Sequence, residues 1–403
     1  MNKAALEGVK ILEYCKTISG AYTTKLMVDL GAEVIKIETP ESGDEARKRG
    51  PFPGDVPDPE KSGLFLYLNI NKLGITLDPR KPKGAEIFKK LVRDVDILVE
   101  DGTPGELEAL ALGYETLKDL NPGLIMASIT PFGRSGPYRD YKAYQLNIAH
   151  ASGQACLLPL PSPNLDRPPV KPGGNASDYD PAMVASVAIM AALFWKGITG
   201  KGQFIEISKL EALMSMQRVE SVTFANDGVI MNRTGTANPM PGGVMPCKDG
   251  YVVSVSPEDH QWNALMELLG NPEWSKKDWC KDSIVRTTHA AELTLLIMDW
   301  MKDRTKEEIF RKGQALSCPI SPLHSSEDMV KSEQLQARGF FVEMDHPAIG
   351  KLKFPSSPYR FSETPWQLNR MAPKLGEHNE EIFGGRLGTA REELVKLKEA
   401  GII

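Results

Sequence analysis

Two aspartates form the first candidate for chemistry in this sequence of 403 residues. Asp178 and Asp180 lie in a polar segment just before a nearly unbroken apolar run, Ala182–Trp195. An acid at the mouth of a buried helix is either a cap for free backbone N–H groups or a reactive carboxylate in a cleft. Because Asp180 directly precedes Pro181, and proline is favoured at the first position of a helix, we expect Asp180 to be the N-cap. Asp178 is then free to point into a cleft.

Motifs for other kinds of catalysis are missing from the sequence. The six histidines stand in neither a His-Glu-x-x-His nor a Gly-x-Ser-x-Gly context, so no metal site is expected. A Ser-His-Asp site assembled in space stays open, but no motif favours it. The five cysteines are scattered without Cys-x-x-Cys spacing, which favours reduced thiols over a disulfide frame or a zinc site.

Composition limits the class of protein. A chain of 403 residues exceeds the usual size of one compact core, which favours two domains. A formal net charge of -5 gives no reason to expect a nucleic-acid partner. The N-terminal segment lacks the apolar core of a signal peptide, and no apolar run reaches the roughly 18 residues of a membrane span. We therefore expect a cytoplasmic protein without a membrane partner.

The elements that must position the acids alternate between strand and helix. Val9–Cys15 and Ala32–Glu38 are predicted strands around a predicted helix, Thr23–Leu30. The alternation continues through a strand at Leu124–Ile129 and favours an α/β fold with a Rossmann-like parallel sheet. Ligands usually bind after the first strand of such a sheet. Gly20 stands alone there, which disfavours a dinucleotide-binding dehydrogenase.

A change in composition along the chain predicts a second, smaller α+β domain. After a loop-rich stretch, Gly250–Val255 is a predicted strand and several short helical segments follow. The expected division is a large domain at 1–224, a small domain at 225–332 and a return to the large domain at 333–403. Within the large domain, Glu41–Lys61 is rich in glycine, proline and charge, and it is expected to form a long surface loop.

Basic side chains lie at strand ends or in the turns that follow them. A set of this kind suits phosphate groups, although each one taken alone is more typical of solvated surface charge. The four are Lys36, Lys72, Arg134 and Lys142.

Several segments in order resemble the class III CoA-transferases, also called the CaiB/BaiF or formyl-CoA transferase family. Each segment alone is weak evidence, but the ordered series spans nearly the whole chain. The segments are LEGVKIL (6–12), DLGAEVIKIE (29–38) with Pro40 and Gly43-Asp44, NKLGITL (71–77), Pro104-Gly105, FGRSGPY (132–138), the Asp178 loop with GKGQ (200–203), QARGFF (336–341) and PKLGEH (373–378).

The resemblance implies that Asp178 is a catalytic nucleophile. It would attack the donor thioester and then carry CoA as an aspartyl-CoA thioester, which the acceptor carboxylate attacks in turn. Backbone N–H groups of a mobile loop containing Gly242 and Gly243 would stabilise the oxyanions and exclude water. No tightly bound cofactor is implied; CoA and acyl-CoA are substrates.

The resemblance also implies where CoA lies. Ile18 and Ser19 would be near the pantetheine, Thr39 near the adenine, and Lys72 and Lys142 near the phosphates. The sequence departs from the family pattern at three places. Glu-Asn-Phe-Arg-Pro-Gly is here EDGTPG (100–105), Ala109 stands where an arginine is common, and Gln145 stands where an acid is usual. These changes affect the detail of CoA binding.

Partners and substrates follow from the same resemblance. It implies an intertwined dimer, either a homodimer or a heteromer with a related subunit, as in relatives that act on benzylsuccinate. We expect succinyl-CoA as the donor and an aryl-substituted or dicarboxylic acid as the acceptor. The alternatives are a non-catalytic CoA-binding subunit and a 2-methylacyl-CoA racemase. Racemisation needs a second proton carrier, where this chain has Tyr144 beside Gln145.

Overall fold

The computed structural model describes residues 4–160, 162, 164–233, 240–347 and 349–403. The chain divides into two compact units. The first comprises Met1–Pro159, Asp166–Arg233 and Phe340–Ile403, and the second comprises Leu160–Leu165 and Thr234–Gly339. The limits at 233 and 339 lie near the boundaries at 224 and 332 expected from composition.

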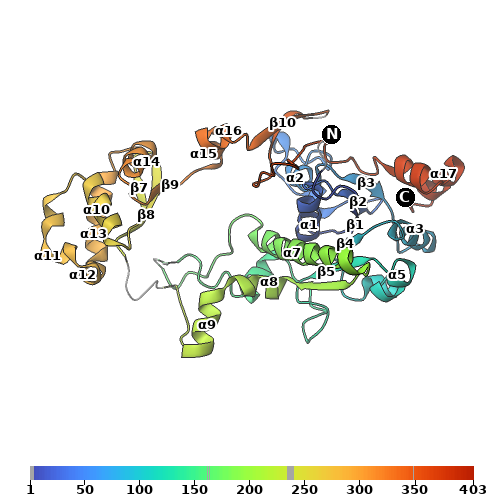
Figure 1. The fold of residues 1–403 in the computed structure, drawn as a ribbon, viewed down its shortest axis with the longest axis horizontal. Coiled ribbons are helices and arrows are strands. Elements are labelled where there is room, and N and C mark those ends of the chain that lie inside the picture. The colour runs from blue at the N-terminus through green and yellow to red at the C-terminus, as the bar shows by residue number, and fades with distance from the viewer. Residues whose placement is uncertain (1–3, 161, 163, 234–239, 348) are drawn as a thin grey trace. The chain divides into compact units, whose positions relative to one another are not determined.

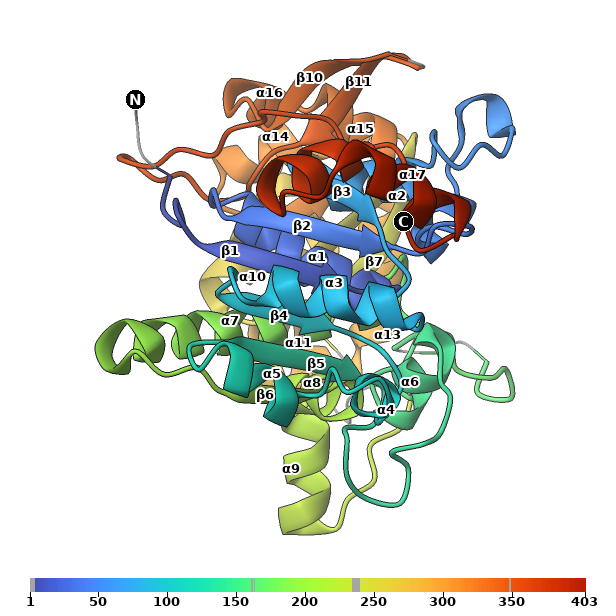
Figure 2. The same ribbon diagram turned by 90° about the vertical axis from the view of Figure 1, so that its right-hand side faces the viewer.

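A six-stranded parallel sheet forms the centre of the first unit, in the order β3-β2-β1-β4-β5-β6. This is the strand order of a doubly wound Rossmann fold, so the predicted α/β class is confirmed. Figure 2 shows the sheet with α3 and α17 in front of it. The strands are β1 (Lys10–Tyr14), β2 (Glu33–Glu38), β3 (Leu73–Thr76), β4 (Ile97–Glu100), β5 (Ile125–Thr130) and β6 (Phe204–Ser208).

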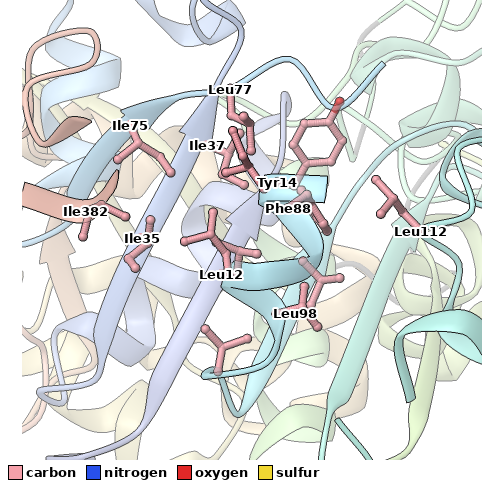
Figure 3. Packing of buried hydrophobic residues seen from close by; sticks show 14 of the residues in the cluster. Leu12, Tyr14, Ile35, Ile37, Ile75, Leu77, Phe88, Leu98, Leu112 and Ile382 are labelled. Atoms are coloured by element: carbon pink, nitrogen blue, oxygen red, sulfur yellow. The ribbon is translucent and has the colours of Figure 1, made fainter. Parts of the chain in front are cut away.

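Apolar side chains leave both faces of this sheet, as expected for buried parallel strands. On β1, Ile11 points to one face and Leu12 to the other. The face of Leu12 packs against Phe88 of α3, as Figure 3 shows. The helices of this unit are α1 (Ile18–Val28), α2 (Gly63–Asn69), α3 (Pro82–Val92), α4 (Glu106–Ala109), α5 (Tyr114–Leu120), α6 (Gln145–Ala151), α7 (Ala176–Thr199), α8 (Lys209–Met216), α9 (Arg218–Asp227) and α17 (Arg391–Glu399).

Helix α7 begins earlier than the sequence indicated. Its N-cap is Asn175 and its first residue is Ala176, which places Asp178 in the first turn and Pro181 inside the helix. The prediction that Asp180 is the N-cap was therefore wrong. Pro181 is the sixth residue of α7, so the helix lacks the one hydrogen bond that an N–H at this position would donate to the carbonyl of Ser177.

The apolar run of α7 is buried on one side only. Ala185, Ile189 and Ala192 pack on the sheet, whereas Val187 and Phe194 are 71% and 74% exposed. The buried helix expected from the apolar run is therefore buried on one face only, since Val187 and Phe194 on the opposite face are exposed in the part of the chain that the structure describes. By length and composition alone, α7 could cross a membrane, a test that helices of soluble proteins also pass.

The segment Glu41–Lys61 is anchored rather than loose. It contains short 3-10 turns at Glu45–Lys48 and Pro53–Asp55. Arg47 is buried, and it donates hydrogen bonds to Glu38 at the end of β2 at 2.6 and 2.9 Å and to the Pro373 carbonyl at 2.9 Å. This ion pair fixes the segment against the carboxyl edge of the sheet. Close to it, β10 (Phe341–His346) and β11 (Gly350–Pro355) form an antiparallel hairpin whose Phe354 packs with α2.

The second unit, whose strands β7 to β9 are labelled in Figure 1, has its own hydrophobic core. An antiparallel sheet, β7-β8-β9, packs against helices through buried residues such as Val252, Trp262 and Leu293. The strands are β7 (Gly242–Cys247), β8 (Gly250–Val255) and β9 (Ile320–Pro322), and the helices are α10 (Asp259–Leu268), α11 (Asp278–Lys281), α12 (Ser283–Thr288), α13 (Ala290–Met301), α14 (Lys306–Ala315), α15 (Ser326–Lys331) and α16 (Glu333–Ala337).

Candidate active site

The carboxyl end of β1 lies where the strand order of the sheet reverses. Such a switch point opens a crevice between the loops that follow the two central strands. Asp101, directly after β4, accepts hydrogen bonds from the backbone N–H groups of Lys16 and Thr17, both at 2.7 Å. Burial raises the pKa of Asp101, although these hydrogen bonds favour its charged form. Asp101 thereby holds the β1–α1 loop in place.

Asp178 lies beside this loop, in the first turn of α7. Asp178 is 8% exposed, and its Oδ1 is 3.0 Å from Nζ of Lys209, which is itself buried. The Ser19 hydroxyl donates to the Asp178 carbonyl at 2.9 Å and lies 3.3 Å from Oδ1. The positive end of the helix dipole favours an anion at this position. Asp178 is therefore a carboxylate held by a cation, a hydroxyl and a helix N-terminus.

The carboxylates of Asp178 and Asp180 are used differently. Residues two positions apart on a helix point to different faces. Asp180 Oδ2 accepts a hydrogen bond from Gln154 Nε2 at 3.0 Å, and Gln154 Oε1 accepts one from Ser177 at 2.9 Å. Asp180 thus ties α7 to the preceding segment, while Asp178 faces the β1–α1 loop.

A cavity of about 510 Å³ adjoins Asp178. Three cations and two carboxylates line it, together with apolar side chains and Tyr144 and Gln145. The charged lining residues are Lys16, Arg49, Lys209, Glu45 and Asp178, and the others are Thr17, Ile18, Ala46, Ala143, Tyr144, Gln145, Leu146 and Ile148. The cavity therefore joins an apolar wall to a carboxylate with cations nearby, an arrangement suited to an acyl chain and an anionic group.

A second cavity of about 450 Å³ lies along the ends of β1, β2 and β3. It shares Lys16 and Glu45 with the first cavity, so the two adjoin along the same edge of the sheet. Thr39, Arg80 and Lys81 line it. The two cavities together give one elongated path that ends at Asp178.

Several predicted binding residues lie along this path. Ile18 lines the cavity beside Asp178, and Thr39 lines the second cavity. Lys142 is exposed next to Ala143 of the lining. Ser19 is fully buried and contacts Asp178 instead of presenting a free hydroxyl. Tyr144, the position considered for a second proton carrier, is 84% exposed at the cavity rim.

Lys72 does not match its expected role. It is fully buried, and its Nζ donates to Glu13 at 2.8 Å, to the Ala21 carbonyl at 2.8 Å and to Asn69 at 3.0 Å. All three donors of an ammonium are thus used inside the protein. We correct the expectation that Lys72 contacts a phosphate. Lys36 is likewise buried, 2.7 Å from Glu13, so the phosphate role considered for it is corrected too.

Gly242 and Gly243 begin strand β7 and do not form a free loop. They pair with Val255 and Ser254 of β8, and the Gly242 N–H donates to the Thr294 hydroxyl at 3.1 Å. In this state the Gly242 N–H is occupied and cannot serve an oxyanion. Both glycines have positive φ, +116° and +90°, which other residues rarely adopt.

Alanine substitutions at Gly242 and Gly243 should destabilise the second unit by different amounts. A Cβ at Gly242 would lie 2.3 Å from the Ser254 carbonyl oxygen, whereas a Cβ at Gly243 meets no atom within 4 Å. We expect Gly242→Ala to destabilise the second unit by about 2 to 4 kcal/mol and Gly243→Ala by about 1 to 2 kcal/mol. Urea unfolding of the two variants measures the free energy that each one loses. Equal losses of stability would contradict the steric argument.

Lys209, Arg49 and Asp101 are site residues that the sequence reasoning did not single out. Lys209 directly follows β6, and Asp101 directly follows β4. Because the carboxyl ends of parallel strands meet at one edge, a charged residue just after a predicted strand was an available signal. Arg49 carried no such signal, since its place depends on the fold of the anchored Glu41–Lys61 segment. Its Nη2 donates to Asn175 Oδ1 at 3.1 Å.

In the part of the chain that the structure describes, no group of three or more histidine, cysteine or acidic residues could hold a metal ion.

A doubly wound sheet with a carboxylate at the end of an elongated cleft defines an α/β enzyme of the kind that acts on an extended ligand along its strand ends. The model of CoA-transferase family III matches residues 6–379. The chain belongs to this family, and it is a CoA-transferase. Its substrates are CoA thioesters and carboxylic acids.

Relatives match over the full length of the chain. A formyl-CoA:oxalate CoA-transferase of Streptomyces avermitilis is 33% identical over 99% of both chains. The succinyl-CoA–L-malate CoA-transferase beta subunit of Chloroflexus aurantiacus is 30% identical over 99% of this chain and 98% of its own. A CaiB/BaiF family protein from Brucella suis has the same fold, with a TM-score of 0.82 and 29% identity over 97% of this chain and 99% of its own.

Proposed function

We propose that this enzyme moves CoA from succinyl-CoA to a dicarboxylic acid through an aspartyl-CoA thioester on Asp178. The observation that carries the proposal is the Asp178 carboxylate, which lines the cavity and is held 3.0 Å from Lys209. A carboxylate is a weak base but a usable nucleophile, and it gives an acyl intermediate that stays reactive.

The reaction proceeds by exchanges between carboxylates and one thiolate. Asp178 attacks the thioester carbonyl of the donor, the C–S bond breaks, and a mixed anhydride and CoA thiolate result. The thiolate then attacks the Asp178 carbonyl, which releases the donor acid and leaves aspartyl-CoA. The acceptor carboxylate repeats the two steps in reverse and leaves with CoA, which restores Asp178. No oxidant, reductant or net proton transfer is needed.

The two cavities support a placement for CoA. The thioester must reach Asp178, so the pantetheine would pass Ile18 and Lys16 and the nucleotide would lie near Thr39. Arg80 and Lys81 line that end and supply cations for phosphate, which charge-assisted hydrogen bonds favour. Lys142 is exposed and remains a proposed phosphate contact.

Substrates and assembly are proposed from the relatives and the surface. The two relatives described above are named for oxalate and malate as acceptors, and one is named for succinyl-CoA and as a beta subunit. The exposed apolar face of α7 supports an interface with a second chain, either a copy or a related subunit. We further propose that the enzyme works in the cytoplasm, where acyl-CoA is available to it. The loop containing Gly242 and Gly243 is proposed to shield the intermediate after it leaves its strand pairing.

Mass spectrometry tests the proposed intermediate. The protein is incubated with a panel of acyl-CoAs, digested at mildly acidic pH and searched for CoA on the peptide that contains Asp178. We expect CoA on that peptide with succinyl-CoA and its loss on treatment with hydroxylamine, which attacks thioesters. Borohydride treatment should reduce Asp178 only in the loaded protein. Absence of CoA or acyl mass on this peptide with every donor would overturn the proposal.

A further inference from the structure

Among the residues that the structure describes, the buried ammonium of Lys209 forms an ion pair with one carboxylate, that of Asp178, and the proposed reaction removes the charge of this carboxylate. Lys209 is 7% exposed and Asp178 is 8% exposed, so neither group is well solvated. Asp178 Oδ1 is the acceptor that the structure gives Lys209 Nζ, at 3.0 Å. When Asp178 becomes a thioester with CoA or an anhydride with an acid, its side chain loses its negative charge. The ammonium then loses the carboxylate to which it is directly bonded, and Asp101, whose charge also interacts with Lys209, is the acid that remains near it. Losing a bonded counter-charge in a poorly solvated place is costly.

The acceptor of this reaction is itself a carboxylate. Both Lys209 and Asp178 line the same cavity, so a carboxylate that enters to attack the Asp178 carbonyl comes within reach of Nζ. An ammonium binds an incoming carboxylate more strongly where water is scarce. The other cations of the lining have partners of their own: Arg49 donates to Asn175, and Lys16 pairs with Glu106 at 3.0 Å. Lys209 is thus the cation whose partner the reaction removes.

We propose that Lys209 pairs with Asp178 in the free enzyme and with the acceptor carboxylate in the aspartyl-CoA intermediate. This inference rests on the proposed function and extends it by a residue that selects for an anionic acceptor. Lys209 holds the attacking oxygen beside the thioester carbonyl and stays protonated throughout. The acceptor oxygen bonds to the Asp178 carbonyl carbon, the C–S bond breaks, and the electron pair leaves on CoA thiolate. When acyl-CoA has formed, Asp178 is again a carboxylate and Lys209 returns to it.

The rates at which two different nucleophiles attack the intermediate provide a test, because a merely structural role of Lys209 would not change the ratio of these rates. Aspartyl-CoA is formed from succinyl-CoA and challenged with isotopically labelled succinate, an anion, and with hydroxylamine, which is neutral at pH 7. The measured quantity is the ratio of the two rates of attack on the intermediate. For Lys209→Met we expect this ratio to fall at least about tenfold, with a raised KM for succinate and little change for hydroxylamine. Lys209→Arg keeps the charge and should restore much of the ratio.

A matched control removes another buried lysine. Lys25 pairs with Asp29 at 2.5 Å, both side chains are buried, and Lys25 lines neither cavity beside the active site. Lys25→Met should destabilise the fold while leaving the ratio unchanged. If Lys209→Met does not fold, Lys209→Gln, which keeps a donor without the charge, must show the same fall.

The outcomes separate this inference from the function on which it rests. CoA on Asp178 with an unchanged ratio in the Met or Gln variant would overturn the role of Lys209 and leave the intermediate intact. No CoA on Asp178 in the wild-type protein would overturn the proposed function itself. An equal fall for succinate and hydroxylamine would mean that Lys209 only maintains the structure, and it would likewise overturn the inference.

Discussion

Asp178→Asn is expected to lower CoA transfer by at least about a thousandfold, because an amide is not a nucleophile. The substitution keeps the shape of the side chain and an oxygen that can accept the Ser19 hydrogen bond. The loss should therefore appear in turnover, with CoA-ester binding largely retained. Steady-state transfer from succinyl-CoA and binding of CoA by calorimetry measure the two effects.

Asp180→Asn is the matched control for this experiment. It lies on the same helix, and its Oδ2 accepts from Gln154 Nε2, a hydrogen bond that an asparagine oxygen can also accept. We expect less than about a threefold change in transfer, since a neutral side chain in a retained hydrogen bond alters little. A loss at Asp180 as large as that at Asp178 would contradict the assignment of the nucleophile to Asp178 alone.

The strands and the fold class were predictable because their signals are local. Buried parallel strands are short apolar runs, and each of the runs at β1, β2 and β5 was placed with errors of a residue or so. The first residues of helices were harder to predict. The Asp180-Pro181 pair is typical of a helix start, but α7 begins at Ala176. In its first turn the Ser19 hydroxyl donates to the Asp178 carbonyl and the Ser177 hydroxyl donates to Gln154, which are contacts with residues distant in sequence.

The residues of the candidate active site could be predicted only in part, because their contacts join side chains that are distant in sequence. Asp178 was predicted as the nucleophile because Asp180 was expected to be the N-cap and because of the family resemblance. The first reason was wrong, since Asn175 is the N-cap, and the two aspartates differ instead in the direction in which they leave the helix. Lys72 lies just before β3 and Lys209 just after β6, but neither position shows whether the ammonium is enclosed by partners or lines a cavity. Burial decides between them: Lys72 has all its donors occupied, whereas Lys209 lines the cavity. Such a distinction depends on side chains that are distant in sequence.

Glu13→Gln is expected to cost about 3 to 5 kcal/mol of folding free energy, because it leaves two buried ammonium groups without their shared counter-charge. Glu13 on β1 is fully buried and is the register partner of Lys36 on β2. Its Oε1 accepts from Lys36 at 2.7 Å, and its Oε2 accepts from Lys72 at 2.8 Å and from Thr24 at 2.6 Å. Lys36 has a further partner in Asp44 at 2.5 Å, so the network continues to the wall of the second cavity.

Glu33→Gln on β2 provides the control, since it weakens an exposed pair. Glu33 Oε1 is 2.6 Å from Arg386, and both side chains are partly exposed. Exposed pairs contribute little, so we expect less than about 1 kcal/mol. Chemical unfolding at pH 7 compares the two variants. Similar losses would show that the buried network contributes no more than a surface pair does.

The pH dependence distinguishes a charge effect from a packing effect at Glu13. Burial alone would raise the pKa of Glu13, but the ammonium groups of Lys36 and Lys72 outweigh it and lower the pKa from 4.5 to about 2. A depressed carboxyl pKa stabilises the fold fully above pH 4.5, and this contribution is lost as the pH falls through about 2. A shift of this size is equivalent to about 3 kcal/mol, in keeping with the expected cost of the substitution. The gap in stability between the wild type and Glu13→Gln should therefore narrow steadily below pH 4.5. A gap that stays constant from neutral pH into acid would instead attribute the loss to shape and hydrogen bonding, because the charge of Glu13 would then have played no part.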